Sequence, residues 1–250
     1  MADTKKYFIE LSYKGTNYHG WQIQPNALTV QEVLDKALST YFRQKVETLG
    51  CGRTDTGVHA IQFFAHFELG TPKSDIEDNA LQSINSLLPF DISVSRILET
   101  APHAHARFDA TLRSYQYNIH FSKNPFLHEK SWLLRDPLDL ASMNQAAAQL
   151  LNYTDFSCFS KSNTQVFTNN CKIAHAKWVE TNEGIVFHIS ADRFLRNMVR
   201  AIVGTMVDIG KGKFSPEVIH DIIKSKNRSN AGASVPACGL YLTEVKYPYI

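Results

Sequence analysis

The order of strands and helices, which occurs twice along the chain, constrains the fold more than any other feature of the sequence. Alternating apolar and polar residues from Tyr7 to Tyr13 predict a half-buried strand. A helix over residues 30–42 is predicted next, because apolar residues recur there at helical spacing behind a capping box formed by Thr29 and Glu32. Strands at residues 46–51, 61–67 and 92–98 and a helix at residues 75–87 complete a β-α-β-β-α-β order.

The second half repeats this order with one additional helix. Its predicted elements are strands at residues 113–121, 171–180, 184–190 and 240–247, and helices at residues 138–151, 193–209 and from Ser215 onward. Each half has the order of the ferredoxin-like split β-α-β unit. Two such units can join into one mostly antiparallel sheet with helices on one face, which leaves the other face for a ligand. We therefore predict an α+β fold with two halves, residues 1–104 and 105–250.

Composition places the chain among ordinary globular proteins. Of its 250 residues, 44% are hydrophobic and 20% are charged, which is typical of that class. No apolar run is long enough for a transmembrane helix, and the first residues lead into a strand without a signal sequence. The four cysteines have no CxxC spacing, so neither a disulfide framework nor a zinc site is predicted. We expect a cytoplasmic protein with reduced thiols and no membrane partner.

The loop CGRTDTGVHA is the first candidate for chemistry, because it places Arg53 and Asp55 between two apolar strands. Aspartates in loops commonly bond to their own backbone in a turn. A long polar loop can also hold a carboxylate at the mouth of a cleft. The neighbouring arginine would then favour the ionised carboxylate that a nucleophile or an electrostatic stabiliser requires. The pattern alone leaves both interpretations open.

The segment YKGTNYHGWQIQP, directly after the first strand, is the second candidate. Its aromatic, imidazole and amide side chains surround two glycines: Tyr13, Tyr18, His19, Trp21, Gln22 and Gln24. Such groups on a loop suit stacking on unpaired bases. The same rings could instead fold back onto the core, and the sequence does not decide between the two.

Two further segments carry arginine and tyrosine. In ADRFLRNMVRAIVG, Asp192 is the expected N-cap of a helix with three arginines on one stripe: Arg193, Arg196 and Arg200. This stripe is either a solvated face or a contact for phosphates. In ARFDATLRSYQYNIH, Tyr115 and Tyr117 lie on the same side of a predicted strand.

Metal ions and nucleotide cofactors are not predicted. His103 and His105 have no further ligand residues at suitable spacing. The chain also has neither a GxGxxG fingerprint nor a GxxxxGK[ST] phosphate loop. We therefore expect a protein that works without a cofactor.

Together these segments resemble the tRNA pseudouridine synthase A family. Similar segments run in the family's order through nearly the whole chain: YKGTNYHGWQIQP, TVQEVLDKAL, GRTDTGVHA, HARFDATLRSYQY, FLRNMVRAIVGTMVDIG and GLYLTEVKYP. Thr56 departs from the pattern, because the family commonly has alanine there. The resemblance implies the pseudouridine synthase fold and an isomerase that converts uridine to pseudouridine in the anticodon stem-loop of tRNA, at positions 38–40.

The resemblance also implies roles for four residues. Asp55 matches the catalytic carboxylate, and Arg200 matches the arginine paired with it, which would keep the carboxylate ionised. Tyr115 matches the tyrosine that packs on the target uracil, and Arg53 matches the residue that replaces the flipped base in the stack. The carboxylate could hold the ribose covalently or take a proton to form a glycal, and the resemblance does not choose.

The implied partner is tRNA. A formal net charge of +2 gives little attraction to its phosphates. Family members form homodimers, so two chains could line one basic cleft. Candidates for this cleft are the basic residues near position 220: Lys211, Lys213, Lys224, Lys226 and Arg228. These residues also fit an ordinary solvated surface.

Two other functional classes are considered. A non-catalytic RNA-binding protein could have the same element order, although neither half carries the aromatic-rich signature of RNA-recognition modules. An aspartate-dependent hydrolase usually needs magnesium held by several carboxylates, and Asp55 has no second carboxylate in its loop. A search for a uridine isomer of unchanged mass in treated tRNA separates the three classes.

Overall fold

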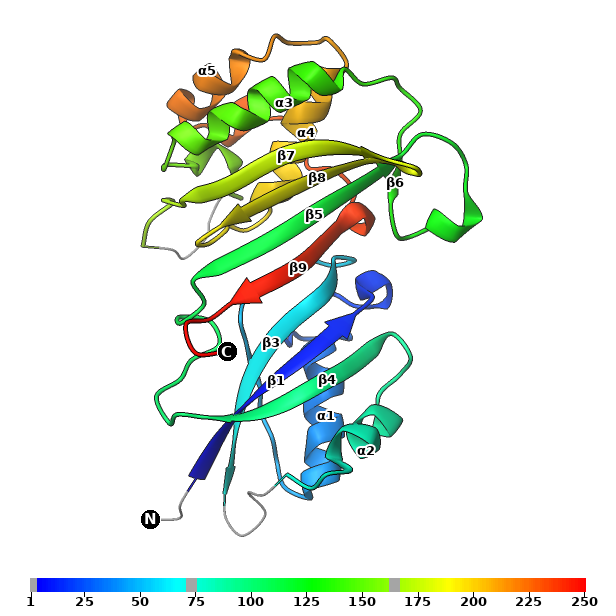
Figure 1. Ribbon diagram of the computed structural model, residues 1–250, viewed down its shortest axis with the longest axis vertical. Helices are drawn as coiled ribbons and strands as arrows, with labels where there is room; N and C mark the ends of the chain where they lie inside the picture. Colours follow the sequence, from blue (N-terminus) through cyan, green and yellow to red (C-terminus); the bar gives the residue numbers. More distant parts are fainter. Residues whose placement is uncertain (1–3, 71–75, 162–166) are drawn as a thin grey trace. The chain divides into compact units, whose positions relative to one another are not determined.

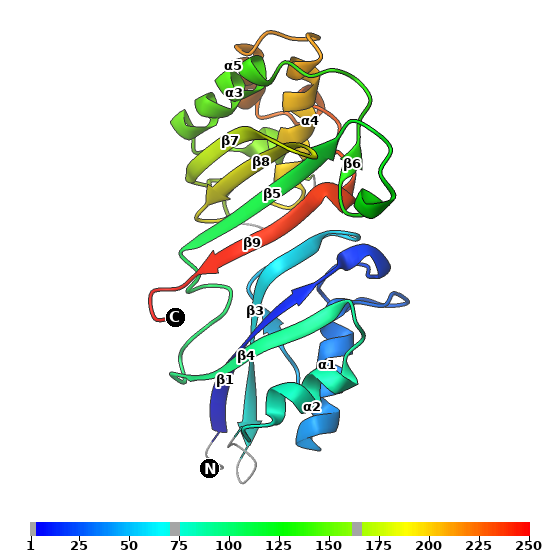
Figure 2. The ribbon, with the colours of Figure 1, turned by 45° about the vertical axis from the view of Figure 1, so that its right-hand side comes forward.

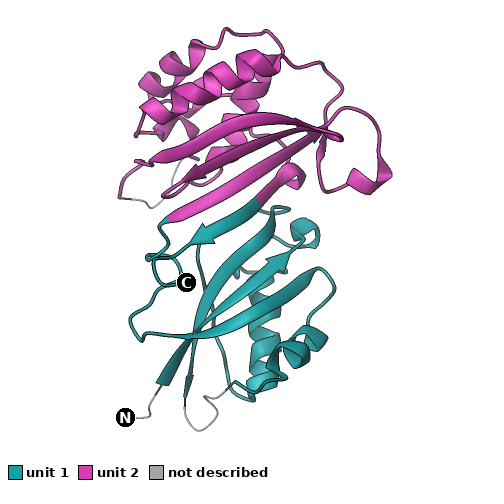
Figure 3. Ribbon diagram, in the orientation of Figure 1, with its two compact units in different colours: residues 1–111, 242–250 teal, residues 112–241 magenta. Residues whose placement is uncertain are grey.

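The computed structural model describes residues 4–70, 76–161 and 167–250 of the chain (Figure 1). The chain forms two compact units, which Figure 3 distinguishes by colour. Unit 1 comprises residues 1–111 and 242–250, and unit 2 comprises residues 112–241. The end of the chain therefore belongs to the same unit as its beginning. Within the described ranges, no helix has the length and apolar character needed to cross a membrane.

Unit 1 has the predicted β-α-β-β-α-β order. Its strands are β1 (Thr4–Tyr13), β2 (Leu49–Gly50), β3 (His59–Gly70) and β4 (Ile92–Thr100), and its helices are α1 (Val30–Phe42) and α2 (Ala80–Leu87). Strand β1 pairs antiparallel with both β3 and β4, and β2 pairs antiparallel with β3. Both helices lie on one side of these strands in Figures 1 and 2.

Unit 2 repeats the pattern with the predicted extra helix. Its strands are β5 (Leu112–His120), β6 (Trp132–Leu133), β7 (Ile173–Thr181) and β8 (Gly184–Ala191), and its helices are α3 (Leu140–Gln149), α4 (Met198–Gly210) and α5 (Val218–Ser225). Strand β8 pairs antiparallel with β5 and β7. The short strand β6, which the sequence did not predict, pairs parallel with β5. The last strand, β9 (Leu240–Lys246), ends in unit 1. The predicted α+β class with mostly antiparallel strands is confirmed.

Helix α1 follows directly from its sequence. The Thr29 hydroxyl oxygen accepts a hydrogen bond from the Glu32 amide at 3.3 Å, as a capping box requires. Its apolar stripe is buried: Val30, Leu34, Ala37, Leu38 and Phe42. The stripe holds the helix on the sheet because burying an aliphatic or aromatic side chain of this size contributes roughly 1.5–3 kcal/mol.

The strand predicted at residues 46–51 is reduced to Leu49–Gly50. Side chains of α1 take the backbone groups that a longer strand would use. The Ser39 hydroxyl accepts a bond from the Val46 amide at 2.9 Å, and the Asp35 carboxylate accepts one from the Thr48 amide at 3.0 Å. A backbone amide donates its single proton once, so these residues join the helix instead of the sheet.

Two predicted helices begin later than their sequence patterns indicated. Helix α2 begins at Ala80, whereas its predicted start at position 75 lies outside the described residues. Helix α4 begins at Met198 and its N-cap is Asn197, so the prediction of Asp192 as N-cap is wrong. Asn197 has a left-handed backbone with φ 67°, which interrupts a right-handed helix at that point. The Asp192 carboxylate instead accepts bonds from the amides of Lys172 and Arg193.

Candidate active site

The Asp55 loop, residues 51–58, joins β2 to β3 at one end of unit 1. Asp55 is half-buried and its carbonyl accepts a bond from the Val58 amide at 3.1 Å, which closes a tight turn. Arg53 is exposed, whereas Thr54 between them is buried and bonds through its hydroxyl to Tyr13 at 3.0 Å. The loop thus has a fixed centre and presents Asp55 and Arg53 at the surface.

A second loop, residues 14–21, packs against the backbone of the Asp55 loop. A Cβ atom on Gly15 would lie 1.9 Å from the Val58 carbonyl oxygen, and one on Gly20 would lie 2.2 Å from that of Thr54. Gly20 also has φ +86°, a conformation that favours glycine. The buried His59 ring accepts a bond from the Gly15 amide at 2.9 Å and ties the two loops together. The two loops, which were separate candidates in the sequence, therefore form one structure.

The rings in this second loop pack inward. Tyr13, Tyr18 and Trp21 are all buried, and the Trp21 ring centre lies 4.2 Å from that of Phe63. The interpretation in which these aromatics fold back onto the core is therefore the correct one for the three rings. His19 and the glutamines of the segment are exposed.

Tyr115 lies on β5 of unit 2, paired in register with Ile189 of β8. Its ring meets that of Phe194 edge to face, with 5.1 Å between centres and an interplanar angle of 89°. Tyr117 is fully buried and its hydroxyl donates to the Pro236 carbonyl at 2.7 Å. Of the two tyrosines predicted on this side, only Tyr115 keeps part of its surface exposed.

Arg200 lies in the first turns of α4 and binds the chain before β9. Its Nε donates to the Val235 carbonyl at 2.8 Å, and the Val235 amide donates to the Arg200 carbonyl at 3.3 Å. Burial raises the pKa of Tyr117, and the Arg200 charge acts against this shift. Arg200 therefore lies close to Tyr117 and is held by a segment that the sequence analysis did not single out.

The predicted arginine stripe is not formed. Arg193 and Arg196 precede α4, so they do not share a helical face with Arg200. Close packing of the 231–236 segment on α4 is visible at Gly204, where a Cβ atom would lie 1.9 Å from the Ala233 carbonyl oxygen. A glycine in the middle of an apolar helix was the available sequence signal for this approach.

The basic cluster near position 220 is largely paired. Lys211, Lys213 and Lys226 form ion pairs at 2.7 Å with Asp136, Asp208 and Asp155, respectively. Arg228 donates to the carbonyls of Ala231 and Gly232 and to the Ser234 hydroxyl. These contacts favour the interpretation as a structural and solvated surface.

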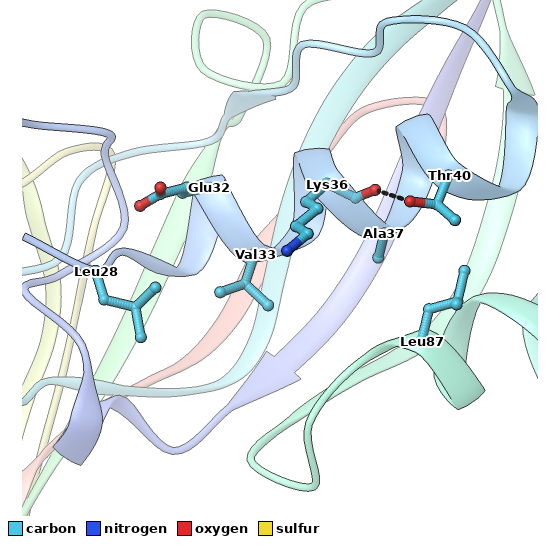
Figure 4. Close-up of a pocket in the computed structure, with 7 residues that line it drawn as sticks. All are labelled: Leu28, Glu32, Val33, Lys36, Ala37, Thr40 and Leu87. Carbon is cyan, nitrogen blue, oxygen red and sulfur yellow. Dashed lines mark hydrogen bonds between the residues drawn. The ribbon is translucent and has the colours of Figure 1, made fainter.

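Among the described residues, neither a metal-binding cluster nor the hollow between α1 and α2 involves the predicted site residues. Within the described part of the chain, no group of three His, Cys, Asp or Glu residues could hold a metal ion. A hollow of about 330 Å³ lies between α1 and α2, and Figure 4 shows its lining: Leu28, Glu32, Val33, Lys36, Ala37, Thr40 and Leu87. None of the four predicted site residues is among them.

Asp55 and Arg53 thus belong to unit 1, and Tyr115 and Arg200 belong to unit 2. The pairing of Asp55 with Arg200 stays a prediction. What unit 1 provides is a carboxylate on a braced loop. What unit 2 provides is an arginine and a partly exposed tyrosine, each held by specific contacts.

The sequence of the chain is similar to sequences of known proteins. A family profile described as tRNA pseudouridine synthase matches residues 146–248. A relative from Bacteroides fragilis, named tRNA pseudouridine synthase A, is 50% identical over 98% of this chain and 97% of its own. Relatives of the same name from Bacteroides thetaiotaomicron and Exiguobacterium sibiricum are 50% and 36% identical, each over 98% of this chain, and over 91% and 97% of their own length. Identity at this level over nearly the full length places the chain in the tRNA pseudouridine synthase A family.

Proposed function

We propose that the protein converts uridine to pseudouridine in the anticodon stem-loop of tRNA, at positions 38–40, without a cofactor. The observation that carries this proposal is the half-buried Asp55 on a loop braced by Gly15, Gly20 and His59. It stands in a chain that is 50% identical to a protein named tRNA pseudouridine synthase A. A fixed carboxylate next to exposed surface suits a nucleophile that must reach a flipped nucleotide.

The chemistry needs one carboxylate and no net change in composition. The bond from uracil N1 to ribose C1′ breaks, the base turns, and a bond from C5 to C1′ forms. The C5 proton leaves and N1 gains one, so the product is an isomer of the substrate. Asp55 either bonds to C1′ while the base turns or removes a ribose proton to give a glycal.

The other three residues have supporting roles in this proposal. Arg200 keeps Asp55 ionised, because a guanidinium favours the charged form of a carboxylate. Tyr115, which is partly exposed, packs on the target uracil. Arg53, exposed on the Asp55 loop, fills the space of the flipped base. Extruding a nucleotide costs a few kcal/mol and least in a loop, which suits an anticodon arm as the target.

We also infer a cytoplasmic homodimer. The resemblance to the family supports this, and so does the charge of the chain. A formal charge of +2 with three of the candidate lysines already in ion pairs leaves one chain with little attraction for phosphates. Two chains together would offer a longer basic surface to one tRNA.

The test is incubation with unmodified tRNA, digestion to nucleosides, and separation of uridine from its isomer. The proposal predicts a new nucleoside of unchanged mass, which is lost from tRNAs whose uridines at positions 38–40 are replaced by cytidine. Loss of phosphate from an ester substrate would indicate a hydrolase instead. Binding to tRNA without any new nucleoside would indicate a non-catalytic RNA-binding protein.

A further inference from the structure

The loop between β5 and β6, residues 121–131, carries a solvent-exposed aromatic ring. Phe126 is 81% exposed, and no ring contact joins it to another aromatic residue among those described. In Figure 1 this loop extends away from the strands of unit 2 as a long excursion with a short helical turn. Single exposed rings are common on protein surfaces, so a ligand is indicated only by what accompanies this one.

Hydrogen bonds hold the backbone of this loop. The Asn124 side chain accepts a bond from the Phe126 amide at 2.9 Å and caps the 3-10 turn Pro125–Leu127. The Leu127 carbonyl accepts bonds from the amides of Lys130 and Ser131. At the far end, the Tyr241 hydroxyl donates to the Lys130 carbonyl at 2.6 Å. A loop whose backbone is already ordered loses little conformational entropy when it binds a ligand.

The surroundings of the ring are basic. In the sequence, the exposed Lys123 and Lys130 flank Phe126, and the exposed His128 lies between Phe126 and Lys130. Neither lysine forms an ion pair within the described part of the chain, in contrast to Lys211, Lys213 and Lys226. One acidic residue, Glu129, accompanies them. An exposed ring flanked by cations is the combination that single-stranded nucleic acids bind, with a base on the ring and phosphates on the cations.

We propose that this loop is a docking site for the tRNA substrate, in which an unpaired base stacks on Phe126 and adjacent phosphates contact Lys123 and Lys130. The inference rests on the proposed function insofar as tRNA is the substrate. It adds a binding element beyond the four residues assigned to the reaction. Its effect is on affinity and not on the chemical step.

The first test measures tRNA affinity and steady-state kinetics for substitutions at Phe126. Phe126→Ala raises the Kd for unmodified tRNA and the KM roughly tenfold, the order expected for one lost stack, and leaves kcat at saturating tRNA unchanged. Phe126→Leu shows the same loss because it keeps apolar area without an aromatic face. Phe126→Trp retains wild-type affinity. Since the ring is exposed, all variants keep the wild-type unfolding midpoint.

Phe90→Ala is the matched control, because Phe90 is a fully exposed phenylalanine of unit 1. It leaves Kd and KM unchanged. Wild-type affinity in Phe126→Leu, or an equal loss in Phe90→Ala, would overturn the assignment. So would a change of oligomeric mass in Phe126→Ala by sedimentation, which would make the loop a contact between protein chains. In each of these cases the wild type still forms pseudouridine, so failure of this inference is distinct from failure of the proposed function.

The second test measures the salt dependence of tRNA binding. Each lysine that neutralises a phosphate contributes roughly one to the slope of log K against log salt. The double variant Lys123→Gln with Lys130→Gln therefore lowers the slope by nearly two. Lys213→Gln with Lys226→Gln, which removes two lysines already paired with aspartates, leaves it unchanged. Equal slopes for the wild type and the first double variant would contradict the phosphate contacts.

Discussion

Gly20 lies where the backbone of the Asp55 loop comes close to the loop that supports it. Replacing it with alanine places a Cβ atom 2.2 Å from the Thr54 carbonyl oxygen at a backbone angle of φ +86°. We expect Gly20→Ala to lower the free energy of unfolding by about 2–4 kcal/mol and to lower turnover, because the loop that carries Asp55 must move. Denaturant unfolding and kcat measure the two effects.

Two glycines of the same chain control for this substitution. Gly212 has φ +72° with nothing within 4 Å of its Cβ position, and Gly52 in the Asp55 loop has free space around that position. Gly212→Ala reports the cost of the backbone angle alone, and Gly52→Ala reports neither cost. Equal stability of the Gly20 and Gly212 variants would mean that the close approach does not matter.

Arg200 is a residue for which a structural and a catalytic role give different results. Its Nε bond to the Val235 carbonyl predicts that Arg200→Ala costs about 1 kcal/mol of stability. If it also keeps Asp55 ionised, Arg200→Ala lowers the activity by orders of magnitude. Arg200→Lys recovers only part of the activity, since an ammonium lacks the two-pronged geometry of a guanidinium.

Arg196 provides the comparison for Arg200, because it is exposed and precedes α4. Arg196→Ala should change stability by less than about 0.5 kcal/mol and leave the rate near the wild type. Similar activities of the two alanine variants would show that Arg200 serves only the fold of unit 2.

At the scale of elements, α1 holds the segment that leads into β2 and the Asp55 loop through one buried carboxylate. Asp35 accepts bonds from the amide and the hydroxyl of Thr48, at 3.0 Å and 2.6 Å. Burial raises the pKa of Asp35 from 3.8 to about 6. Because the folded-state pKa exceeds the unfolded one, the folded protein binds this proton more tightly. The contribution to stability is thus fully present below about pH 4 and is lost as the pH rises through about 6.

Asp35→Asn tests this account because the amide retains an acceptor for Thr48 and carries no charge. Relative to the wild type, its free energy of unfolding should be about 2–3 kcal/mol larger, and the variant thus more stable, at pH 8 than at pH 4. Asp35→Ala removes the acceptor and should be destabilising at both pH values. Chemical denaturation at the two pH values measures this difference, and a pH-independent effect of the asparagine variant would contradict the raised pKa.

The elements that could be predicted from the sequence are those that local interactions specify. Helix α1 was predicted with its cap because Thr29, Glu32 and the apolar stripe all lie within one segment. The start of α4 was not, because Asp192 bonds to the Lys172 amide, twenty residues earlier in the chain. The strand predicted at 46–51 is shorter than predicted for the same reason, since the side chains of Ser39 and Asp35 accept bonds from the backbone amides of Val46 and Thr48. Long-range side-chain bonds of this kind leave no periodic pattern.

In the candidate site, too, locally visible features were predicted and long-range contacts were not. Asp55 and Arg53 could be predicted as candidates because they lie in a polar loop between two apolar strands. The support of that loop by residues 14–21 was not predicted. The need for glycine at positions 15 and 20 arises from backbone contact between segments that are separate in the sequence. The pairing of Asp55 with Arg200 rests on resemblance and stays a prediction.

At the scale of the whole chain, the C-terminal residues complete unit 1. Tyr247 is buried, its hydroxyl donates to the Ala106 carbonyl at 2.6 Å, and its ring packs edge-on against Phe8 and Phe64. This tail covers Phe8 of β1. The end of the chain is therefore part of the core that forms around its beginning.

Shortening the chain after Lys246 should destabilise unit 1 by about 3–5 kcal/mol, because it exposes the rings of Phe8 and Phe64. Tyr247→Phe, which removes only the hydroxyl, should cost about 1–2 kcal/mol through the unpaired Ala106 carbonyl. Thermal unfolding of the two variants gives both values. A truncated protein with wild-type stability would mean that the tail only rests on unit 1.

Asp55→Asn tests the central claim most directly, because the amide keeps the shape of the side chain and lacks the nucleophile. Nucleoside analysis of tRNA treated with this variant, together with its Kd for tRNA, separates catalysis from binding. The account predicts no detectable pseudouridine, with the Kd and the unfolding midpoint close to those of the wild type. Pseudouridine formed by the variant at the wild-type rate would contradict it, since the carboxylate on the braced loop would then have no part in the reaction.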